Sequence, residues 1–421
     1  MTESSASLFE RARKVIPGGV NSPVRAFGAV GGAPVFMERG AGARLTTADG
    51  RELLDFCGSW GPLILGHAHP KVVEAVCAAV RDGTSFGAST RREVEFAELI
   101  CRQAPALEQV RLVSSGTEAV MTALRLARGV TGRAGILKFD GGYHGHGDSM
   151  LAAAGSGLLT GGIASSAGVP AGVVADVGSV PYNDLAAVDA WVGQKGDSLA
   201  AIIVEPAAGN MGLVPPEPGF LEGLRAACDR CGALLILDEV ITGFRFGPTT
   251  YGNLHGIIPD LTCLGKIIGG GLPLGAVGGT RSVMEALAPL GPVYQAGTLS
   301  GNPAAVAAGM ATLTALLEEK PYERLDALGR MLAEGVNRIA REKGIALHAA
   351  QAGSLFTPFF RKERVRNLAD TKACDTRAFA LFFNRMLERG IYLPPSPFEV
   401  SFISSAHTDA DVERFLSAVA N

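Results

Sequence analysis

One lysine stands in a stretch that is otherwise made of small and apolar residues. Lys266 follows the apolar run of residues 261–264, and three consecutive glycines occupy positions 269–271. An ammonium group in such surroundings is costly unless it is paired or neutral. A neutral lysine amine is a nucleophile that bonds to aldehydes, so this position favours covalent chemistry. The alternative is a surface lysine at the end of a strand, with its amine in water.

Further polar residues follow other apolar runs that have the pattern of buried strands. They are Ser115, Gly116 and Thr117 after "VRLVS", Tyr143 and His144 after "GILKF", Glu205 and Asn210 after "AAIIV", and Asp238 after "ALLIL". In an open parallel sheet, ligands bind beyond the carboxyl ends of the strands. We therefore expect these side chains and Lys266 to meet at one edge of a sheet.

Pyridoxal 5'-phosphate suits this set of residues. The segment 115–117 at a helix N-terminus would hold its phosphate, as would a second loop that places Thr298 before another helix. An aspartate such as Asp238 keeps the ring nitrogen protonated, so that the ring acts as an electron sink. Tyr143 would cover the ring face.

Each member of the set also has a structural interpretation. The segment 115–117 would serve as a helix cap, Tyr143 as part of the core, and Asp238 as a turn cap or, with Glu239, as a metal ligand. Nucleotide motifs are absent, since Lys266 is followed by Ile267 rather than Ser or Thr. The histidine pairs at 67 and 69 and at 144 and 146 lack the further ligands of a zinc site.

Composition narrows the class of protein. The chain has 421 residues, of which 47% are hydrophobic and 19% charged, which is typical of a globular protein with a large core. A net charge of -3 gives no reason to expect nucleic acid or an anionic membrane as partner. Seven scattered cysteines and a polar start indicate a reducing, cytoplasmic setting.

The element pattern predicts an α/β fold with a second, smaller domain. Apolar strands alternate with helices from about residue 70 to 320, which indicates a mostly parallel central sheet with helices on both faces. Both chain ends have an α+β pattern. We therefore predict a small domain from residues 1–65 and 325–421 and a large domain from residues 66–324. The glycine-rich residues 151–173 predict a mobile lid or a disordered loop.

The sequence resembles the glutamate-1-semialdehyde 2,1-aminomutases, a branch of the class III aminotransferases with the fold-type I architecture. The resemblance runs nearly end to end. It is carried by "NSPVRAF", "SSGTEAVMTALRLARG", "GGYHGHGDSML", "DEVITGFR", "TCLGKIIGGG" and "YQAGTLSGNP". The stretch of residues 244–260, "FRFGPTTYGNLHGIIPD", departs from the family's usual polar insert.

The resemblance implies a role for each site residue. Lys266 would form the Schiff base and carry protons, and Asp238 would pair with the pyridine nitrogen. Ser115, Gly116 and Thr117 would hold the phosphate, with Thr298 from the second subunit of a homodimer. Tyr143 would stack on the ring, and Asn210 would bond to its phenolic oxygen. The substrate pocket would comprise Ser22, Arg25, Trp60, Ser156 and Glu399, with Arg25 and Ser22 at the substrate carboxylate.

The implied reaction is an isomerisation in tetrapyrrole (porphyrin) biosynthesis. Glutamate 1-semialdehyde would become 5-aminolevulinate by way of 4,5-diaminovalerate, with the cofactor alternating between pyridoxamine 5'-phosphate and pyridoxal 5'-phosphate. The resemblance also implies a transient contact with glutamyl-tRNA reductase, which makes the aldehyde. One alternative is a class III ω-aminotransferase that acts on a small amino or keto acid. Another is a scaffold of the same fold that has lost its cofactor.

Overall fold

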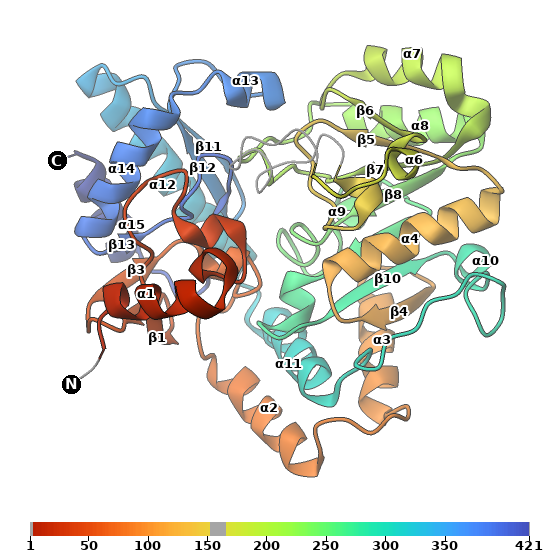
Figure 1. The fold of residues 1–421 in the computed structure, drawn as a ribbon, viewed down its shortest axis with the longest axis horizontal. Helices are drawn as coiled ribbons and strands as arrows, with labels where there is room; N and C mark the ends of the chain where they lie inside the picture. Colours follow the sequence, from red (N-terminus) through yellow and green to blue (C-terminus); the bar gives the residue numbers. More distant parts are fainter. Residues whose placement is uncertain (1–2, 152–165, 421) are drawn as a thin grey trace.

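The structure is a computed structural model that describes residues 3–151 and 166–420. A large sheet with its helices lies on the right of Figure 1, and the two chain ends, red and blue, lie together on the left. The predicted lid at 151–173 falls mostly outside the described residues. Of the part that is described, residues 171–173 belong to the short helix α6 (Ala171–Val174).

The central sheet has seven strands in the order β4-β10-β9-β8-β7-β5-β6. Their bounds are β4 Gln109–Val113, β10 Gly275–Gly279, β9 Leu261–Leu264, β8 Leu234–Asp238, β7 Leu199–Val204, β5 Gly135–Phe139 and β6 Val177–Val180. Strands β9, β8, β7, β5 and β6 pair in parallel, whereas β10 is antiparallel to both of its neighbours. The prediction of a mostly parallel sheet is therefore confirmed.

Helices cover both faces of this sheet, as predicted. Helix α4 (Gly116–Thr131) packs on one face, where it contacts Ile236 of β8. Helices α7 (Leu185–Lys195) and α8 (Phe220–Cys231) cover the other face, where Leu235 and Leu237 point. Successive residues of a strand therefore point into the hydrophobic cores on opposite faces of the sheet. Because both faces are buried, these strands are apolar throughout.

The start of α4 differs in detail from the capping box that Ser115 and Glu118 suggest. Ser115 Oγ accepts a hydrogen bond from the Glu118 backbone N–H at 3.2 Å, as an N-cap should. The Glu118 carboxylate, however, accepts from the backbone N–H of Ser114 at 2.7 Å rather than from that of Ser115. The N–H groups of the first turn have no partner within the helix.

The chain ends form two smaller sheets, the first of which contains strands from both ends, and this confirms the predicted α+β unit. One has the order β1-β2-β3-β13 and the other β11-β12-β14. Their bounds are β1 Met37–Ala41, β2 Arg44–Thr47, β3 Glu52–Asp55, β13 Ile391–Tyr392, β11 His348–Ala352, β12 Leu355–Phe359 and β14 Ser401–Phe402. Strand β13 pairs in parallel with β3, which ties residues 52–55 to the C-terminal segment. The domain boundaries stay a prediction.

Helices of the chain ends and of the linking segments complete the fold. They are α1 Ser5–Val15, α2 Pro70–Asp82, α3 Arg91–Gln103, α9 Tyr251–Leu254, α10 Arg281–Met284, α11 Pro303–Glu319, α12 Tyr322–Lys343, α13 Leu368–Lys372, α14 Thr376–Glu388 and α15 Asp409–Ala420. Among the described residues, no helix is long and apolar enough to cross a membrane.

Helix α11 packs directly behind the segment that carries Lys266, the short 3-10 helix η6 (Lys266–Gly269). A Cβ atom at Gly309 of α11 would lie 2.1 Å from the carbonyl oxygen of Ile268 and 2.8 Å from the Phe96 ring. Only a residue without a side chain permits this approach. The position of Lys266 therefore depends on the close contact between α11 and η6.

We predict that Gly309→Ala lowers the free energy of unfolding by about 1–3 kcal/mol, because the added methyl group overpacks this contact. Gly193→Ala is the matched control, since a Cβ at this position of α7 meets no atom within 4 Å. It should raise the free energy of unfolding by about 0.5–1 kcal/mol. Urea unfolding measures both changes. Equal stability of Gly309→Ala and the parent chain would contradict the contact.

Candidate active site

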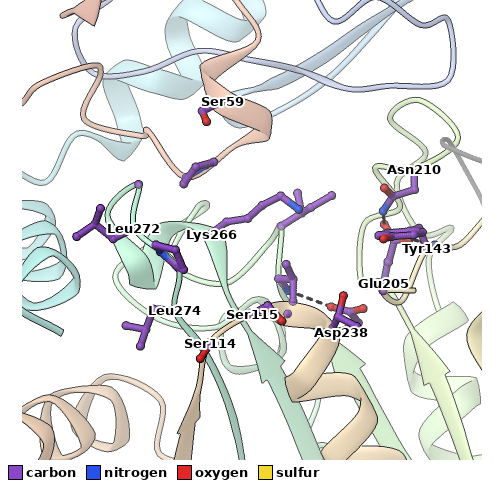
Figure 2. Close-up of a pocket in the computed structure, with 18 of the residues that line it drawn as sticks. Ser59, Ser114, Ser115, Tyr143, Glu205, Asn210, Asp238, Lys266, Leu272 and Leu274 are labelled. Atoms are coloured by element: carbon purple, nitrogen blue, oxygen red, sulfur yellow. Dashed lines mark hydrogen bonds between the residues drawn. The ribbon is translucent and has the colours of Figure 1, made fainter. Parts of the chain in front are cut away.

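A cavity of about 500 Å³ opens at the carboxyl edge of the central sheet. Its lining brings together most residues that the sequence assigned to a cofactor, and one that it assigned to the substrate, Arg25. The cofactor residues are Ser115, Gly116, Thr117, Tyr143, Asn210, Asp238 and Lys266. Figure 2 shows Lys266 between Asp238 and Ser59 of the N-terminal segment, with Tyr143, Glu205 and Asn210 grouped to one side. The expectation that these strand ends meet at one edge is therefore met.

Lys266 has a strained backbone and a partly buried side chain. Its φ of 46° lies in the left-handed region, which is uncommon for a residue with a side chain and occurs most often at functional sites. Burial lowers the pKa of the amine below its ordinary value, and Arg245 acts in the same direction. The carboxylates of Asp238, Glu399 and Glu205 oppose that shift. The amine consequently loses its proton more readily than an exposed lysine does.

Asp238 ends β8 with its carboxylate buried and held by two donors. Its Oδ2 is 2.7 Å from His144 Nδ1, and its Oδ1 accepts from the Val240 backbone N–H at 3.1 Å. Because an ionised carboxylate only accepts, Nδ1 of His144 carries the proton in this bond. The buried Nε2 of His144 has no hydrogen-bond partner among the residues that the structure describes. The pair thus fixes the direction of the carboxylate toward the cavity.

The N-terminus of α4 forms a narrow cradle for an anion. The backbone N–H groups of Gly116 and Thr117 belong to the first turn, where the helix dipole favours negative charge. Neighbouring chain approaches closely: a Cβ at Gly275 would lie 2.5 Å from the Ser115 carbonyl oxygen, and one at Gly145 would lie 2.6 Å from Thr117 Oγ1. A side chain at Gly275 or Gly145 would clash with Ser115 or Thr117, so the shape of the cradle depends on these two glycines.

Glu205 organises the side of the cavity that holds Tyr143 and Asn210. Its Oε1 accepts from the Tyr143 backbone N–H at 2.9 Å, and its Oε2 accepts from Gly209 N–H at 2.8 Å and from Asn210 Nδ2 at 2.9 Å. Burial raises the pKa of Glu205, while His144 and the backbone N–H donors oppose that rise. Burial likewise raises the pKa of the Tyr143 hydroxyl.

A second cavity of about 430 Å³ adjoins the first and shares Tyr143, Asn210 and Lys266 with it. Its lining includes three residues that the sequence assigned to the substrate: Ser22, Trp60 and Glu399. Strand β14 contributes Phe402 to the same wall. The two cavities therefore place a substrate-sized space next to the lysine.

Among the predicted site residues that the structure describes, Thr298 is not brought to these cavities. Thr298 is exposed and lies outside both linings. Its assignment required a second subunit, so it stays a prediction. Ser156 lies outside the described residues.

Sequence reasoning left other residues of the site without a role. The sequence places His144 at the ligand edge without a role, and in the structure it contacts Asp238. Glu205 was placed at the ligand edge, but nothing in its local sequence showed that it holds Asn210. Arg245 in "DEVITGFR" is also buried beside the site. The sequence signal that could have identified such residues is a polar or charged residue inside or shortly after an apolar run.

The cavity fits pyridoxal phosphate. The cradle at residues 115–117 suits its phosphate, and the fixed carboxylate of Asp238 suits a protonated ring nitrogen. Tyr143 lines the same cavity, and Lys266 presents an amine that loses its proton more readily than an exposed lysine. Within residues 3–151 and 166–420, no cluster of His, Cys, Asp and Glu side chains is arranged to hold a metal ion.

Comparison with known proteins identifies the family that the sequence motifs indicate. Residues 27–416 match the family profile described as "Aminotransferase class-III". The chain belongs to the class III aminotransferase family. A relative named glutamate-1-semialdehyde 2,1-aminomutase, from Desulfatibacillum aliphaticivorans, is 54% identical over 416 residues, which are 99% of this chain and 98% of that one.

Solved structures share the whole class III fold. An ω-transaminase from Sphaerobacter thermophilus has a TM-score of 0.89 at 36% identity, and the match covers 99% of this chain and 96% of that one. A glutamate-1-semialdehyde aminomutase from Pseudomonas aeruginosa PAO1, in complex with PMP, has a TM-score of 0.88 at 28% identity over 99% and 93% of the two chains. The fold-type I architecture expected from the sequence is confirmed.

We predict that the reactivity of Lys266 toward an acylating reagent rises at lower pH than that of Lys71 in the cofactor-free protein. Burial lowers the pKa of Lys266, whereas hydrogen bonds to Glu318 and Glu319 raise the pKa of Lys71. The neutral amine is the form that reacts, so its fraction grows as the pH approaches each pKa. Pulse labelling followed by peptide mass spectrometry measures both residues in one sample. The reverse order would contradict the assigned surroundings of Lys266.

Proposed function

We propose that this class III aminotransferase converts glutamate 1-semialdehyde into 5-aminolevulinate, for tetrapyrrole synthesis, by way of 4,5-diaminovalerate. The reaction is an isomerisation: the amino group moves to the neighbouring carbon, and no second substrate is consumed. The observation that carries the proposal is the 54% identity to a glutamate-1-semialdehyde 2,1-aminomutase over nearly the full length of both chains.

Lys266 is the residue that moves protons. When bound, the pyridoxal or pyridoxamine phosphate cofactor exchanges the amino group and withdraws electrons from the reacting carbon. Each half of the transfer needs a proton to leave one carbon atom and reach another. Lys266 lines both cavities, which supports the use of one amine in both halves. Burial lowers its pKa, so a larger fraction of this amine is in the basic form than for an exposed lysine at the same pH.

The remaining residues bind and orient. Asp238, fixed by His144, holds the positive end of the ring system, and the α4 cradle holds the phosphate. Arg25 lines the first cavity and Ser22 lines the second, which supports their proposed role at the substrate carboxylate. Asn210, whose amide bonds to Glu205, is the proposed partner of the phenolic oxygen. Trp60 and Glu399 bound the substrate space.

An intermolecular ω-aminotransferase is the second candidate. The observation that favours it is the 36% identity to a solved ω-transaminase, compared with 28% to the solved aminomutase from Pseudomonas aeruginosa. Lys266 and Asp238 suit both reactions. A transaminase, however, needs an amino acceptor such as 2-oxoglutarate, whereas the isomerisation does not.

The assembly and location form part of the proposal. A homodimer would bring Thr298 of a second copy to the phosphate cradle. Its exposed position, with the exposed apolar side chains of Leu290, Tyr294 and Leu299 nearby in the chain, supports an interface there.

The seven cysteines are free, which fits a reducing cytoplasm. A transient contact with glutamyl-tRNA reductase stays a prediction from the resemblance.

We predict that the purified protein with its cofactor forms 5-aminolevulinate from glutamate 1-semialdehyde without an added amino acceptor. Lys266→Ala should lower the rate by about 10²–10⁴-fold or more, because general acid–base transfer is lost together with the covalent link. Colorimetric assay of 5-aminolevulinate measures the product. Lys71→Ala is the control, since Lys71 is an exposed lysine of α2 that pairs with Glu318.

Faster turnover with 2-oxoglutarate and a small amine donor than with the semialdehyde would contradict the aminomutase and favour the transaminase. Loss of activity in Lys71→Ala equal to that in Lys266→Ala would contradict the assigned base.

A further inference from the structure

A turn made of four consecutive left-handed residues lies beside both cavities. The φ angles of Gly58, Ser59, Trp60 and Gly61 are 52°, 54°, 68° and 111°. Ser59 lines the first cavity and Trp60 lines the second. Left-handed backbone is unfavourable for residues that carry a Cβ atom, and it persists only where the surroundings hold it in place.

Asp55 holds the start of this turn. Its carboxylate is buried and accepts hydrogen bonds from the Cys57 N–H at 2.8 Å and from the Gly58 N–H at 3.2 Å. His67 Nε2 lies 2.7 Å from the same carboxylate and fixes its orientation. The beginning of the turn is thus attached to the end of β3.

Arg245 holds the end of the turn. Its Nη2 donates to the carbonyl oxygen of Gly61, and its Nε donates to that of Ile241 at 2.8 Å. Its Nη1 contacts Ser354 Oγ at 3.4 Å, and the guanidinium carbon lies 4.9 Å from the centre of the Phe402 ring. One side chain therefore connects the loop after Asp238, the N-terminal turn and the C-terminal strands.

The surroundings of Arg245 show that this contact is specific. The side chain is 1% exposed, and across the described ranges no carboxylate forms an ion pair with it. Burial lowers its pKa, but an arginine keeps its charge in proteins. A buried charge without a counterion is unfavourable unless hydrogen bonds compensate it. An aliphatic residue would fill the space at lower cost, so packing alone does not account for an arginine here.

Neighbouring side chains pack tightly against the backbone of Gly61. A Cβ atom at this position would lie 2.7 Å from Phe402 Cε1 and 3.1 Å from Arg245 Nη2. The turn, the ring and the guanidinium are therefore in direct contact. A change in Arg245 reaches Trp60 through a single intervening residue.

We propose that Arg245 is a positioning residue that holds Gly61, and through it Trp60, as the wall of the substrate cavity. It acts through the turn and does not touch the reacting atoms. The inference deepens the proposed function and rests on it only for the effect on the substrate. The arrangement of the turn itself can be tested without turnover.

Trp60 provides its own probe, because the chain has only two tryptophans and Trp191→Phe leaves Trp60 as the sole emitter. In that background, Arg245→Met should raise the acrylamide quenching constant of Trp60 about twofold, because the turn opens locally. Arg245→Lys, which keeps the charge but loses the fork of donors, should give a smaller rise. Arg225→Met is the matched control, since Arg225 pairs with Asp229 and Asp260, away from both cavities.

The same variants separate binding from chemistry. Arg245→Met should raise KM for glutamate 1-semialdehyde about tenfold with a smaller change in kcat, because it loosens a wall that contacts bound substrate in the ground state and transition state alike. Partial rescue by Arg245→Lys would support the role.

A folded Arg245→Met protein with unchanged Trp60 quenching and unchanged KM would overturn the proposal. If Arg245→Met does not fold, Arg245→Lys decides by the same two measurements. If the protein does not turn over the semialdehyde at all, the proposed function fails, while the quenching result still confirms or refutes the positioning role. The two failures are therefore distinguishable.

Discussion

Burial of the Lys266 amine beside fixed carboxylates is the interaction on which the site depends. Removing the amine from water lowers its pKa and favours its neutral, nucleophilic form. The carboxylates of Asp238, Glu399 and Glu205 raise the pKa and favour the protonated form. Neither effect alone suits a group that must bond to a carbonyl carbon and also carry protons. The balance exists because the carboxyl ends of neighbouring strands meet at one edge, so that groups far apart in the sequence face one cavity.

The precision of the site comes from backbone contacts that glycine permits. Gly309 lets α11 approach the segment behind Lys266, and Gly275 lets β10 pass against the carbonyl of Ser115. In both places a side chain would displace a segment that carries a functional group. The high glycine content of the chain is therefore partly a consequence of how closely the elements around the cavity pack.

Part of the cofactor site could be predicted because Ser115, Asp238 and Lys266 stand at or just after the ends of buried strands, which is a local signal. Strand β10 could not, since "GAVGG" lacks the branched residues typical of a strand and is formed through pairing with β4 and β9. The contact of His144 with Asp238 spans 94 positions, and that of Arg245 with Gly61 spans 184. Such contacts follow from tertiary packing, and no local pattern reports them. Thr298 stays a prediction because its role requires a second chain.

We expect Lys266, and no other lysine, to bond covalently to pyridoxal phosphate. Reduction of the loaded protein with borohydride makes that bond permanent, and peptide mass spectrometry then locates it. We predict that the mass of the reduced cofactor is found on the peptide containing Lys266, in stoichiometric amount. Modification of Lys138, the buried lysine of β5, in place of Lys266 would contradict the account, as would the absence of any stable adduct.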